Sequence, residues 1–489
     1  MIDPIEQSPV PFRVPGSKSP SRRALRIAIL HYHLRRGGVT RVIELASEAL
    51  VAAGHEVLVF AGEVPPPGGQ PVEVLSGLRY GCGIGEAADL VSGVSAACRR
   101  RWGADADVLH VHNHSLGKNL ALPTACTVWA LSGRAMVLQM HDFAENGRPA
   151  NYRYLKNASG GAANLDLYPQ GGRIALAVLT SHAAAAFAAA GGSAEVLPNP
   201  VVLPAGGDPI NPGDLGAESL VVYPTRGIRR KNLGEFLLHA AAAPKGVLYA
   251  VTAAPAGGKD LELYAEWRRF SEALGLPVLF DAAQVTGRPL GDFFPGAATC
   301  MTTSMEEGFG MAFLEPWAAG CPLTGRDLPA VTEDFRDEGL QLDSLYARWE
   351  IPAGLLDRRA VNRTTDLAVD AALEAYGLPP SAKARTLARE AVWGPGGADF
   401  GRLDELAQKE VIASARGLPP PELPMPSRDV ITANRALLAG KFSSAAYGDR
   451  LEAIYQRIIE ATGEVPVYLD SRRVLDAILD FSDFSALRF

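Results

Sequence analysis

Short apolar runs alternate with helical patterns along this chain, and this alternation limits its fold most strongly. The first run, Leu25–Leu30, has the length of a strand and is followed by the adjacent glycines Gly37 and Gly38. Apolar residues then recur with helical spacing over residues 42–50, and a second apolar run begins at Val57. This order of strand, glycine turn, helix and strand is typical of the start of a doubly wound α/β sheet.

The chain is long enough for more than one such sheet. Its 489 residues exceed what one ordinary hydrophobic core holds, which predicts two or three domains. Residues 205–217 are rich in Gly, Pro and Asp, as is typical of an interdomain linker. We therefore expect these parts: a flexible N-terminal tail (1–20), a first Rossmann-like domain (21–204), the linker (205–217), a second Rossmann-like domain (218–445) with an extra helical segment (340–420), and C-terminal helices (446–489).

Composition narrows the class of protein. Hydrophobic residues make up 47% and charged residues 21% of the chain, as in globular proteins. The net charge of −7 gives no reason to expect nucleic acid as a partner. Five scattered cysteines without a C-x-x-C pair indicate free thiols in a reducing compartment. Because neither a signal peptide nor a run of eighteen apolar residues is found, we expect a cytoplasmic protein without a transmembrane segment.

Most histidines follow predicted strands. Seven of the nine lie in or just after such strands, namely His31, His33, His110, His112, His114, His141 and His182. Ligands of open α/β sheets bind outside the carboxyl ends of the strands, so this clustering favours a binding cleft. Alternate histidines on one strand also suggest a metal site, but no Cys, Asp or Glu at ligand spacing accompanies them. We therefore predict no metal.

An acidic stretch lies in the second half of the chain. Glu307 precedes the turn Gly308-Phe309-Gly310, and Glu315 stands before Pro316, a residue tolerated only near a helix start. We expect Glu307 in the turn and Glu315 in the first turn of a helix. The two carboxylates can then face one ligand from two directions, while backbone N–H groups of the turn meet phosphate.

A basic stretch lies between a predicted strand, Leu220–Tyr223, and a predicted helix over residues 233–243. Four of the six residues from 226 to 231 are basic: Arg226, Arg229, Arg230 and Lys231. The N-terminus of the helix adds positive potential at the same place. Arg offers a planar fork to phosphate oxygens and Lys a compact point charge, so the stretch is a candidate phosphate site.

The acidic stretch resembles the signature of the family-four retaining glycosyltransferases of GT-B fold, the group that includes sucrose-phosphate-type and mannosyl-type synthases. The pattern E-G-F-G-x-x-x-x-E is met by residues 307–315, the A-x-G-x-P turn is matched around Ala319-Gly320-Cys321-Pro322, and a G-x-x-P-E-type loop corresponds to residues 326–331. The chain departs from the family at Pro316-Trp317 and at Arg326-Asp327.

The resemblance implies roles for particular residues. Glu307 would contact the hydroxyls of the donor sugar and Glu315 the ribose of the nucleotide, with Gly308, Phe309 and Gly310 in the turn between them. Gly37 and Gly38 would approach the donor phosphates. His141 matches the strand-end histidine that binds the sugar. Arg226 and Lys231 have the family spacing of five and would stabilise the diphosphate.

The resemblance also implies an architecture and a reaction. Two Rossmann-like domains would face each other across a cleft, the first holding the acceptor, with the C-terminal helices returning to it. A hexosyl group would pass from a nucleoside-diphosphate sugar to a hydroxyl acceptor with retention of configuration. Neither a cofactor nor a metal is implied.

Other functions stay open at this point. A sugar phosphorylase of the same fold would bind inorganic phosphate at Arg226 and Lys231, and it would release sugar 1-phosphate instead of nucleotide. A regulatory protein would bind the donor without turnover and use residues 340–420 to contact a partner. A dehydrogenase is disfavoured because the chain lacks a dinucleotide fingerprint.

Overall fold

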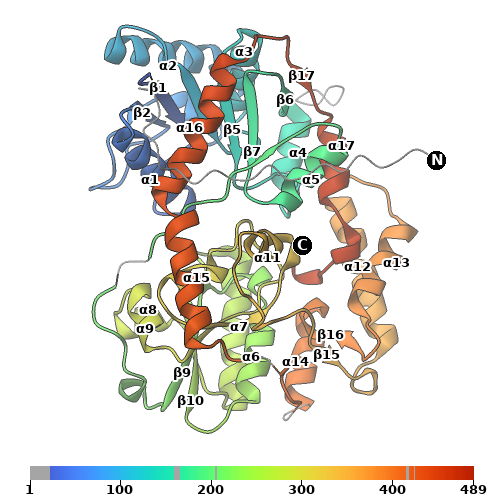
Figure 1. Cartoon of the computed structure of the whole chain (residues 1–489). Coiled ribbons are helices and arrows are strands. Elements are labelled where there is room, and N and C mark those ends of the chain that lie inside the picture. Colours follow the sequence, from blue (N-terminus) through green and yellow to red (C-terminus); the bar gives the residue numbers. More distant parts are fainter. Residues whose placement is uncertain (1–22, 159–165, 204–205, 415–417, 423, 489) are drawn as a thin grey trace, which may run out of the picture.

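Two parallel β-sheets form the centres of two α/β domains (Figure 1). The computed structural model describes residues 23–158, 166–203, 206–414, 418–422 and 424–488, so the predicted tail over 1–20 lies outside the described residues. The first sheet has the order β3-β2-β1-β4-β5-β7-β8. Its strands are β1 (Arg26–Leu30), β2 (Glu56–Ala61), β3 (Glu73–Val74), β4 (Val108–His112), β5 (Met136–Met140), β7 (Ile174–Val178) and β8 (Glu195–Val196).

The second sheet is the centre of the second domain and has the order β11-β10-β9-β12-β13-β14. Its strands are β9 (Ser219–Arg226), β10 (Val247–Ala253), β11 (Val278–Leu279), β12 (Thr299–Thr302), β13 (Leu323–Arg326) and β14 (Leu345–Tyr346). Neighbouring strands run parallel in both sheets. The strand order reverses beside β1 in one sheet and beside β9 in the other, and ligands of such sheets bind at these switch points. The predicted fold of two Rossmann-like domains is confirmed.

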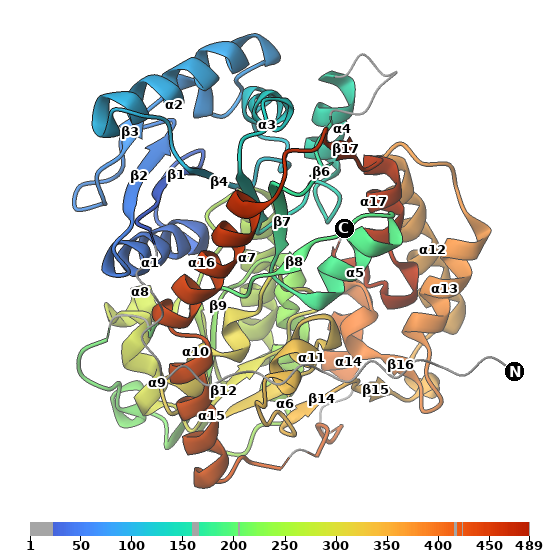
Figure 2. The same cartoon turned by 45° about the horizontal axis from the view of Figure 1, so that its top comes forward.

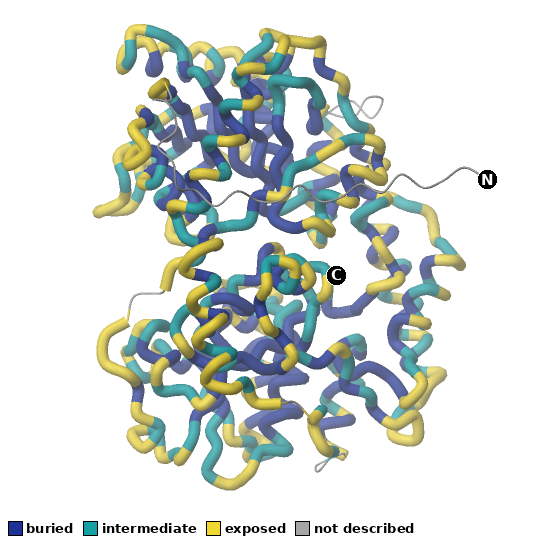
Figure 3. The backbone as a smooth tube through the Cα atoms, in the orientation of Figure 1, coloured by how far each residue is buried: buried dark blue, intermediate teal, exposed yellow. Residues whose placement is uncertain are grey.

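Helices cover both sheets. The central strands, such as β4, β5 and β12, are buried and belong to the dark blue interiors of the two domains in Figure 3. The helices associated with the first domain are α1 (Gly38–Ala52), α2 (Ala87–Trp102), α3 (Ala121–Leu131), α4 (Pro149–Ala158) and α5 (Ser181–Ala189). Those of the second domain are α6 (Leu233–Ala241), α7 (Gly258–Leu274), α8 (Ala282–Thr286), α9 (Phe293–Gly296), α10 (Glu315–Ala318) and α11 (Pro329–Asp337). No helix among the described residues is long and apolar enough to cross a membrane.

The C-terminal helices return to the first domain, as predicted. Helix α15 (Arg428–Lys441) lies on the second domain, and α16 (Ser444–Glu460) continues from it to pack against α1, as both cartoon views show (Figures 1 and 2). A side chain at Gly448 would place its Cβ 2.9 Å from that of Ala49, so the close approach of the two helices requires glycine there. The hydroxyl of Tyr447 donates to Gln139 Oε1 at 2.9 Å and joins α16 to β5.

The segment predicted as an extra helical region contains α12 (Arg358–Ala375), α13 (Ala382–Val392) and α14 (Glu405–Ser414), with the short pair β15 (Glu350–Ile351) and β16 (Ala398–Asp399). Apolar residues of α12 and α13 share one hydrophobic cluster with the first domain. The hydroxyl of Tyr376, just after α12, accepts from the backbone N–H of Arg148 at 2.9 Å. This helical pair therefore connects the two domains on the side opposite to α15 and α16 (Figure 1).

The end of the chain follows a second return path. After α16, strand β17 (Val467–Tyr468) pairs with β6 (Pro169–Gln170), and α17 (Ser471–Ile478) packs against α5. Two short turns of 3-10 helix follow, η9 (Phe481–Asp483) and η10 (Ala486–Arg488), of which η9 packs against α13. Residues 480–488, which we call the C-terminal segment, thus lie between the two domains and not on the first domain alone.

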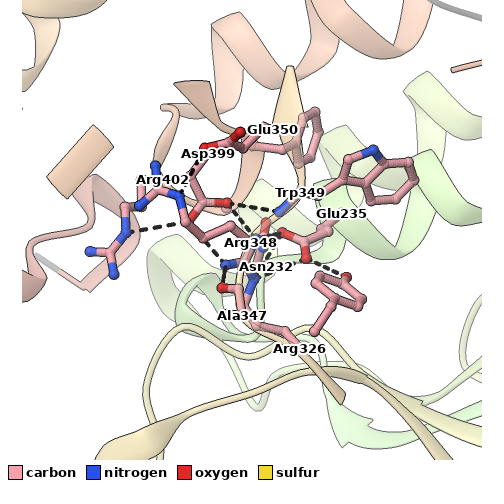
Figure 4. A network of polar contacts seen from close by, with 12 residues as sticks. Asn232, Glu235, Arg326, Ala347, Arg348, Trp349, Glu350, Asp399 and Arg402 are labelled. Carbon is pink, nitrogen blue, oxygen red and sulfur yellow. Dashed lines mark hydrogen bonds and ion pairs between the residues drawn. The ribbon is translucent and has the colours of Figure 1, made fainter. Parts of the chain in front are cut away.

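A buried arginine holds the second domain together near the sheet edge (Figure 4). Arg326 ends β13, and its side chain is 2% exposed. Its guanidinium donates to both oxygens of Glu235 on α6 (2.9 and 2.7 Å) and to both oxygens of Asp399 on β16 (3.0 and 2.8 Å). Tyr346 also donates to Glu235, at 2.5 Å. The departure from the family pattern at Arg326 therefore has a structural role, because this side chain joins three separate segments.

Replacing Arg326 with Met should destabilise the fold strongly, because Glu235 and Asp399 would then be left buried without their common cation. Breaking a buried ion pair from one side costs about 3–5 kcal/mol, measurable as a lower free energy of unfolding in urea. Arg268→Met is the matched control, since Arg268 is 49% exposed and pairs with Glu272 on the same helix. The control should lose less than about 1 kcal/mol. Equal losses in the two variants would contradict the organising role of Arg326.

Candidate active site

A cavity of about 320 Å³ lies between the two domains. The first domain contributes the loop after β5, including His141, Asp142 and Arg148. The second domain contributes the loops after β12 and β13. The C-terminal segment adds a further wall with Asp480, Asp483 and Arg488. The cavity therefore lies at the carboxyl ends of parallel strands, where ligands of open α/β sheets bind.

His141 lines the cavity directly after β5. Its backbone N–H donates to Asn113 Oδ1 at 2.7 Å, and its Nε2 lies 2.9 Å from Nδ1 of His112. Asn113 has a φ of 55° and follows β4, so a left-handed turn places its amide beneath His141. Burial lowers the pKa of His141 to about 3, and its imidazole is therefore neutral at neutral pH. A neutral imidazole can donate to or accept from a sugar hydroxyl.

The other strand-end histidines divide into two groups. His31, His110, His112 and His114 are buried, and the rings of His110 and His112 stack with centroids 4.4 Å apart. His110 bonds to Tyr455 of α16 at 2.7 Å, and His114 donates to the carbonyl of Leu167 at 2.7 Å. By contrast, His33 is partly exposed beside Tyr80, and His182 is exposed and lines the cavity. Within the described ranges, no group of three or more His, Cys, Asp or Glu side chains is arranged to hold a metal ion.

Glu307 and Lys231 form an ion pair at the cavity, and Glu307 lines it. The two side chains are 9% and 12% exposed. Ser304 donates to the same Glu307 oxygen at 2.7 Å. Burial opposes ionisation of Glu307, but the pair with Lys231 and the Ser304 hydrogen bond outweigh it and hold its pKa below the usual value. Two stretches predicted separately, the basic one and the acidic one, thus meet in one contact.

The turn after Glu307 brings the two domains close together. A Cβ at Gly308 would lie 3.4 Å from the carbonyl oxygen of His141, so Gly308 faces the first domain directly. Gly310 has a φ of +83°, and a Cβ there would lie 2.7 Å from Val331 Cγ1. The side chain of Phe309 is buried against Phe335, with ring centroids 5.6 Å apart. Phe309 therefore packs in the core of the second domain, and only the backbone of the turn is available to a ligand.

Glu315 begins helix α10, in the first turn as expected, with Pro316 next to it. Burial raises its pKa to about 7. Among the described residues no hydrogen-bond or ion-pair partner of its carboxyl is found. A desolvated carboxyl without a hydrogen-bond partner costs free energy unless a ligand supplies one. The Glu315 carboxyl is therefore suited to accept hydrogen bonds from hydroxyl groups of a ligand.

Seven of the predicted residues lie outside the lining of the cavity, namely Gly37, Gly38, Arg226, Lys231, Phe309, Gly310 and Glu315. Arg226 ends β9 and is exposed. Gly37 and Gly38 are exposed at the start of α1, where Gly37 is the N-cap residue. The first-domain wall of the cavity comes instead from the loop after β5 and from the start of α5.

Several cavity residues were not predicted. Arg230 and Arg402 of the second domain, Arg148 of the first and Arg488 of the C-terminal segment all line the cavity. Arg148 pairs with Asp142 at 2.7 Å, and Arg402 pairs with Asp483. Of these four, only Arg230 belongs to a stretch with a sequence signal, the basic run. The other three come from distant parts of the chain that no local spacing connects.

Comparison with known proteins gives a family and a fold. Residues 36–203 match the model of Glycosyltransferase Family 4. No curated protein matches the chain at a significant level. The chain is similar to the structure of sucrose-phosphate synthase from Thermosynechococcus elongatus, with 14% identity, a TM-score of 0.50 and coverage of 90% of this chain and 100% of that one.

Two further solved structures are similar at lower TM-scores. The catalytic domain of starch synthase IV from Arabidopsis thaliana, bound to ADP and acarbose, has 11% identity and a TM-score of 0.49, with 89% of this chain and 100% of that one covered. HepE from Anabaena, in complex with UDP-glucose, has 15% identity and a TM-score of 0.48, with 88% and 99% covered.

The family match covers the first domain, and the two facing Rossmann-like domains with their returning C-terminal helix are those of the GT-B fold. Residues 36–203 are therefore similar to Glycosyltransferase Family 4, and the whole chain has the GT-B fold.

Proposed function

We propose that this protein is a retaining hexosyltransferase, which moves a sugar from a nucleoside-diphosphate sugar to a hydroxyl group of an acceptor. The observation that carries the proposal is the ion pair of Lys231 and Glu307 at a cavity that His141 lines from the other domain. One cation, one carboxylate and one neutral imidazole thus converge from two sheets.

The leaving group is the first requirement of this reaction. Breaking the bond to the sugar leaves negative charge on the diphosphate, and preorganised cations stabilise that charge as it develops. Lys231 is held in place by Glu307, and Arg226 ends β9 five residues earlier in the chain, outside the cavity lining. We assign to these two residues the charge stabilisation that a divalent cation supplies in other transferases. Backbone N–H groups of the turn over 308–310 and of Gly37 and Gly38 would complete the phosphate contacts.

The sugar is positioned by the groups that face it. His141 is neutral and Glu307 is ionised, so the pair can donate to one hydroxyl and accept from another. Holding the anomeric carbon against the acceptor hydroxyl supplies a large part of the rate increase. The cavity walls come from both domains, so that closure of the domains excludes water and limits hydrolysis.

The donor and the reaction can be tested together. Nucleoside-diphosphate sugars are screened for an increase in melting temperature, since a ligand at a hundred times its Kd adds about 2.7 kcal/mol. The sugar that stabilises the protein is then incubated with hydroxyl acceptors, and the products are separated. Released nucleoside diphosphate supports the proposal. Sugar 1-phosphate formed with inorganic phosphate would indicate a phosphorylase, and binding without any product would indicate a regulatory protein.

Lys231→Ala should lower kcat by about 10²–10³-fold, which is the loss seen when one preorganised donor to a developing charge is removed. The physical reason is that Lys231 acts on charge present mainly in the transition state. The measurement is steady-state release of the nucleoside diphosphate. Lys409→Ala is the control, because Lys409 pairs with Glu266 away from the cavity and should keep full activity. Near-native turnover of the Lys231 variant would refute its role.

The affinity for the nucleoside-diphosphate sugar should depend on pH through Glu315. The folded protein holds the pKa of Glu315 at about 7, above its ordinary value, so the carboxyl is largely protonated at pH 5.5 and ionised above pH 7. Ribose hydroxyls donate to the ionised form, so the affinity should rise by about tenfold per pH unit up to that pKa and then level off. Calorimetric titrations at several pH values would measure this. Glu315→Gln should remove the dependence, and an unchanged pH profile in that variant would contradict the ribose assignment.

A further inference from the structure

The four cations of the basic run lie in four different environments. Arg226 is exposed at the end of β9. Arg229 donates to both oxygens of Glu405 on α14, at 2.5 and 3.0 Å, and its backbone N–H donates to Asp260. Lys231 pairs with Glu307. Arg230 lines the cavity, which neither Arg226 nor Arg229 does.

Arg230 is a cation for which no ion-pair partner is found among the described residues. Its Nε is buried and has no hydrogen-bond partner, and no ion pair of its guanidinium occurs in the part of the chain that the structure describes. A buried donor left without a partner costs free energy, so such an atom at a cavity wall indicates a ligand that accepts from it. The positive charge of Arg230 also helps to hold the pKa of Glu307 low, which places it close to that carboxylate.

The backbone of Arg230 is held in place independently of its side chain. Its carbonyl oxygen accepts from the backbone N–H of Met305 at 2.9 Å, so the basic run is joined to the loop that carries Glu307. The short 3-10 helix η4 (Arg229–Lys231) is further fixed by the hydroxyl of Tyr223, which donates to the carbonyl of Lys231 at 3.0 Å. The guanidinium is therefore presented from a fixed loop.

A second guanidinium comes to the same cavity from the end of the chain. The turn η10, which contains Arg488, packs against η4, and Arg488 lines the cavity beside Arg230. Nε of Arg488 lies 3.8 Å from Oε2 of Glu306, and its carbonyl oxygen would be 3.5 Å from a Cβ at Gly147 of the first domain. Nη1 of Arg488 also lies 3.9 Å from Oδ2 of Asp483, so Arg488 already has carboxylate partners and would assist Arg230 in binding an anion.

We propose that Arg230 is a further residue of the donor site and binds the diphosphate of the nucleotide sugar, with Arg488 from the C-terminal segment beside it. The inference rests on the proposed function, since it assigns the diphosphate of that donor as the ligand. A planar guanidinium matches phosphate oxygens with two parallel hydrogen bonds, whereas the neighbouring Lys231 supplies a point charge. The chain end thus becomes part of the substrate site.

The test is calorimetric binding of inorganic pyrophosphate, UDP and ADP to the full-length protein. Arg230→Ala should weaken pyrophosphate, and whichever nucleotide the native protein binds, by at least about tenfold, as expected for the loss of a charge-assisted contact. Arg230→Lys should recover part of the affinity. The corresponding nucleoside, uridine or adenosine, should bind all variants equally, because it has no phosphate. Arg488→Ala should show a smaller loss in the same direction.

Arg229→Ala is the matched control, because it removes the adjacent guanidinium, whose partner is Glu405 outside the cavity. It should change pyrophosphate affinity by less than about twofold. Native pyrophosphate affinity in Arg230→Ala overturns the inference, and so does an equal loss for the nucleoside, which would indicate a disturbed fold. A change confined to the KM of the acceptor would overturn it as well, since the anion would then belong to the acceptor.

The inference and the proposed function fail in different ways. If the native protein binds pyrophosphate through Arg230 but transfers no sugar from any nucleotide sugar, the phosphate site is supported and the proposed transferase activity is refuted. If sugar transfer is observed and Arg230→Ala retains native kinetics and native pyrophosphate affinity, the proposed activity is supported and the proposed role of Arg230 is refuted.

Discussion

The buried guanidinium of Arg326 is the interaction on which the second domain depends most. It draws together β13, α6 and β16, which come from distant parts of the sequence, through Glu235 and Asp399. The basic run precedes α6, and Arg402 follows β16, so the segments that carry both reach the cavity from anchored positions. Such a network tolerates little change, because any missing member leaves a charge buried in a medium of low dielectric constant. The rigidity of this side of the cavity therefore originates in the Arg326 network, whose central arginine also lines the cavity.

The cavity itself exists only because the two domains are connected in several places. Helix α16 packs on α1, the pair α12 and α13 joins the cluster of the first domain, and the C-terminal segment lies between the domains. Gly308 approaches the carbonyl of His141, which leaves little room for a side chain between the domains. Residues on opposite walls of the cavity are thus held by backbone contacts, and small changes in the angle between the domains would alter the distance between them.

The surroundings of each ionisable group set its protonation state in the ligand-free site. His141 is neutral because burial disfavours its charged form, and Glu307 is ionised because Lys231 and Ser304 compensate for burial. Glu315 lies between these cases, with burial alone raising its pKa to about 7. Most acids and bases of the cavity are already paired, as Asp142 with Arg148 and Asp483 with Arg402. Among the described arginines that line the cavity, Arg230 alone has no ion pair, so it is the one best suited to an added negative charge.

The sequence by itself determined the local structure and the reaction class. Apolar runs and glycine turns predicted the strands and helices around both switch points, since these patterns reflect periodicities of 2 and 3.6 residues. The spacing of Glu307 and Glu315 and of Arg226 and Lys231 indicated the family, because loops after strands carry binding groups in order along the chain. Only the tertiary structure decided that Phe309 packs in the core, that Arg226 is exposed outside the cavity lining, and that Arg230, Arg402 and Arg488 share one cavity. The physical reason is that burial and cavity walls arise from contacts between segments up to hundreds of residues apart, and local spacing contains no information about those contacts.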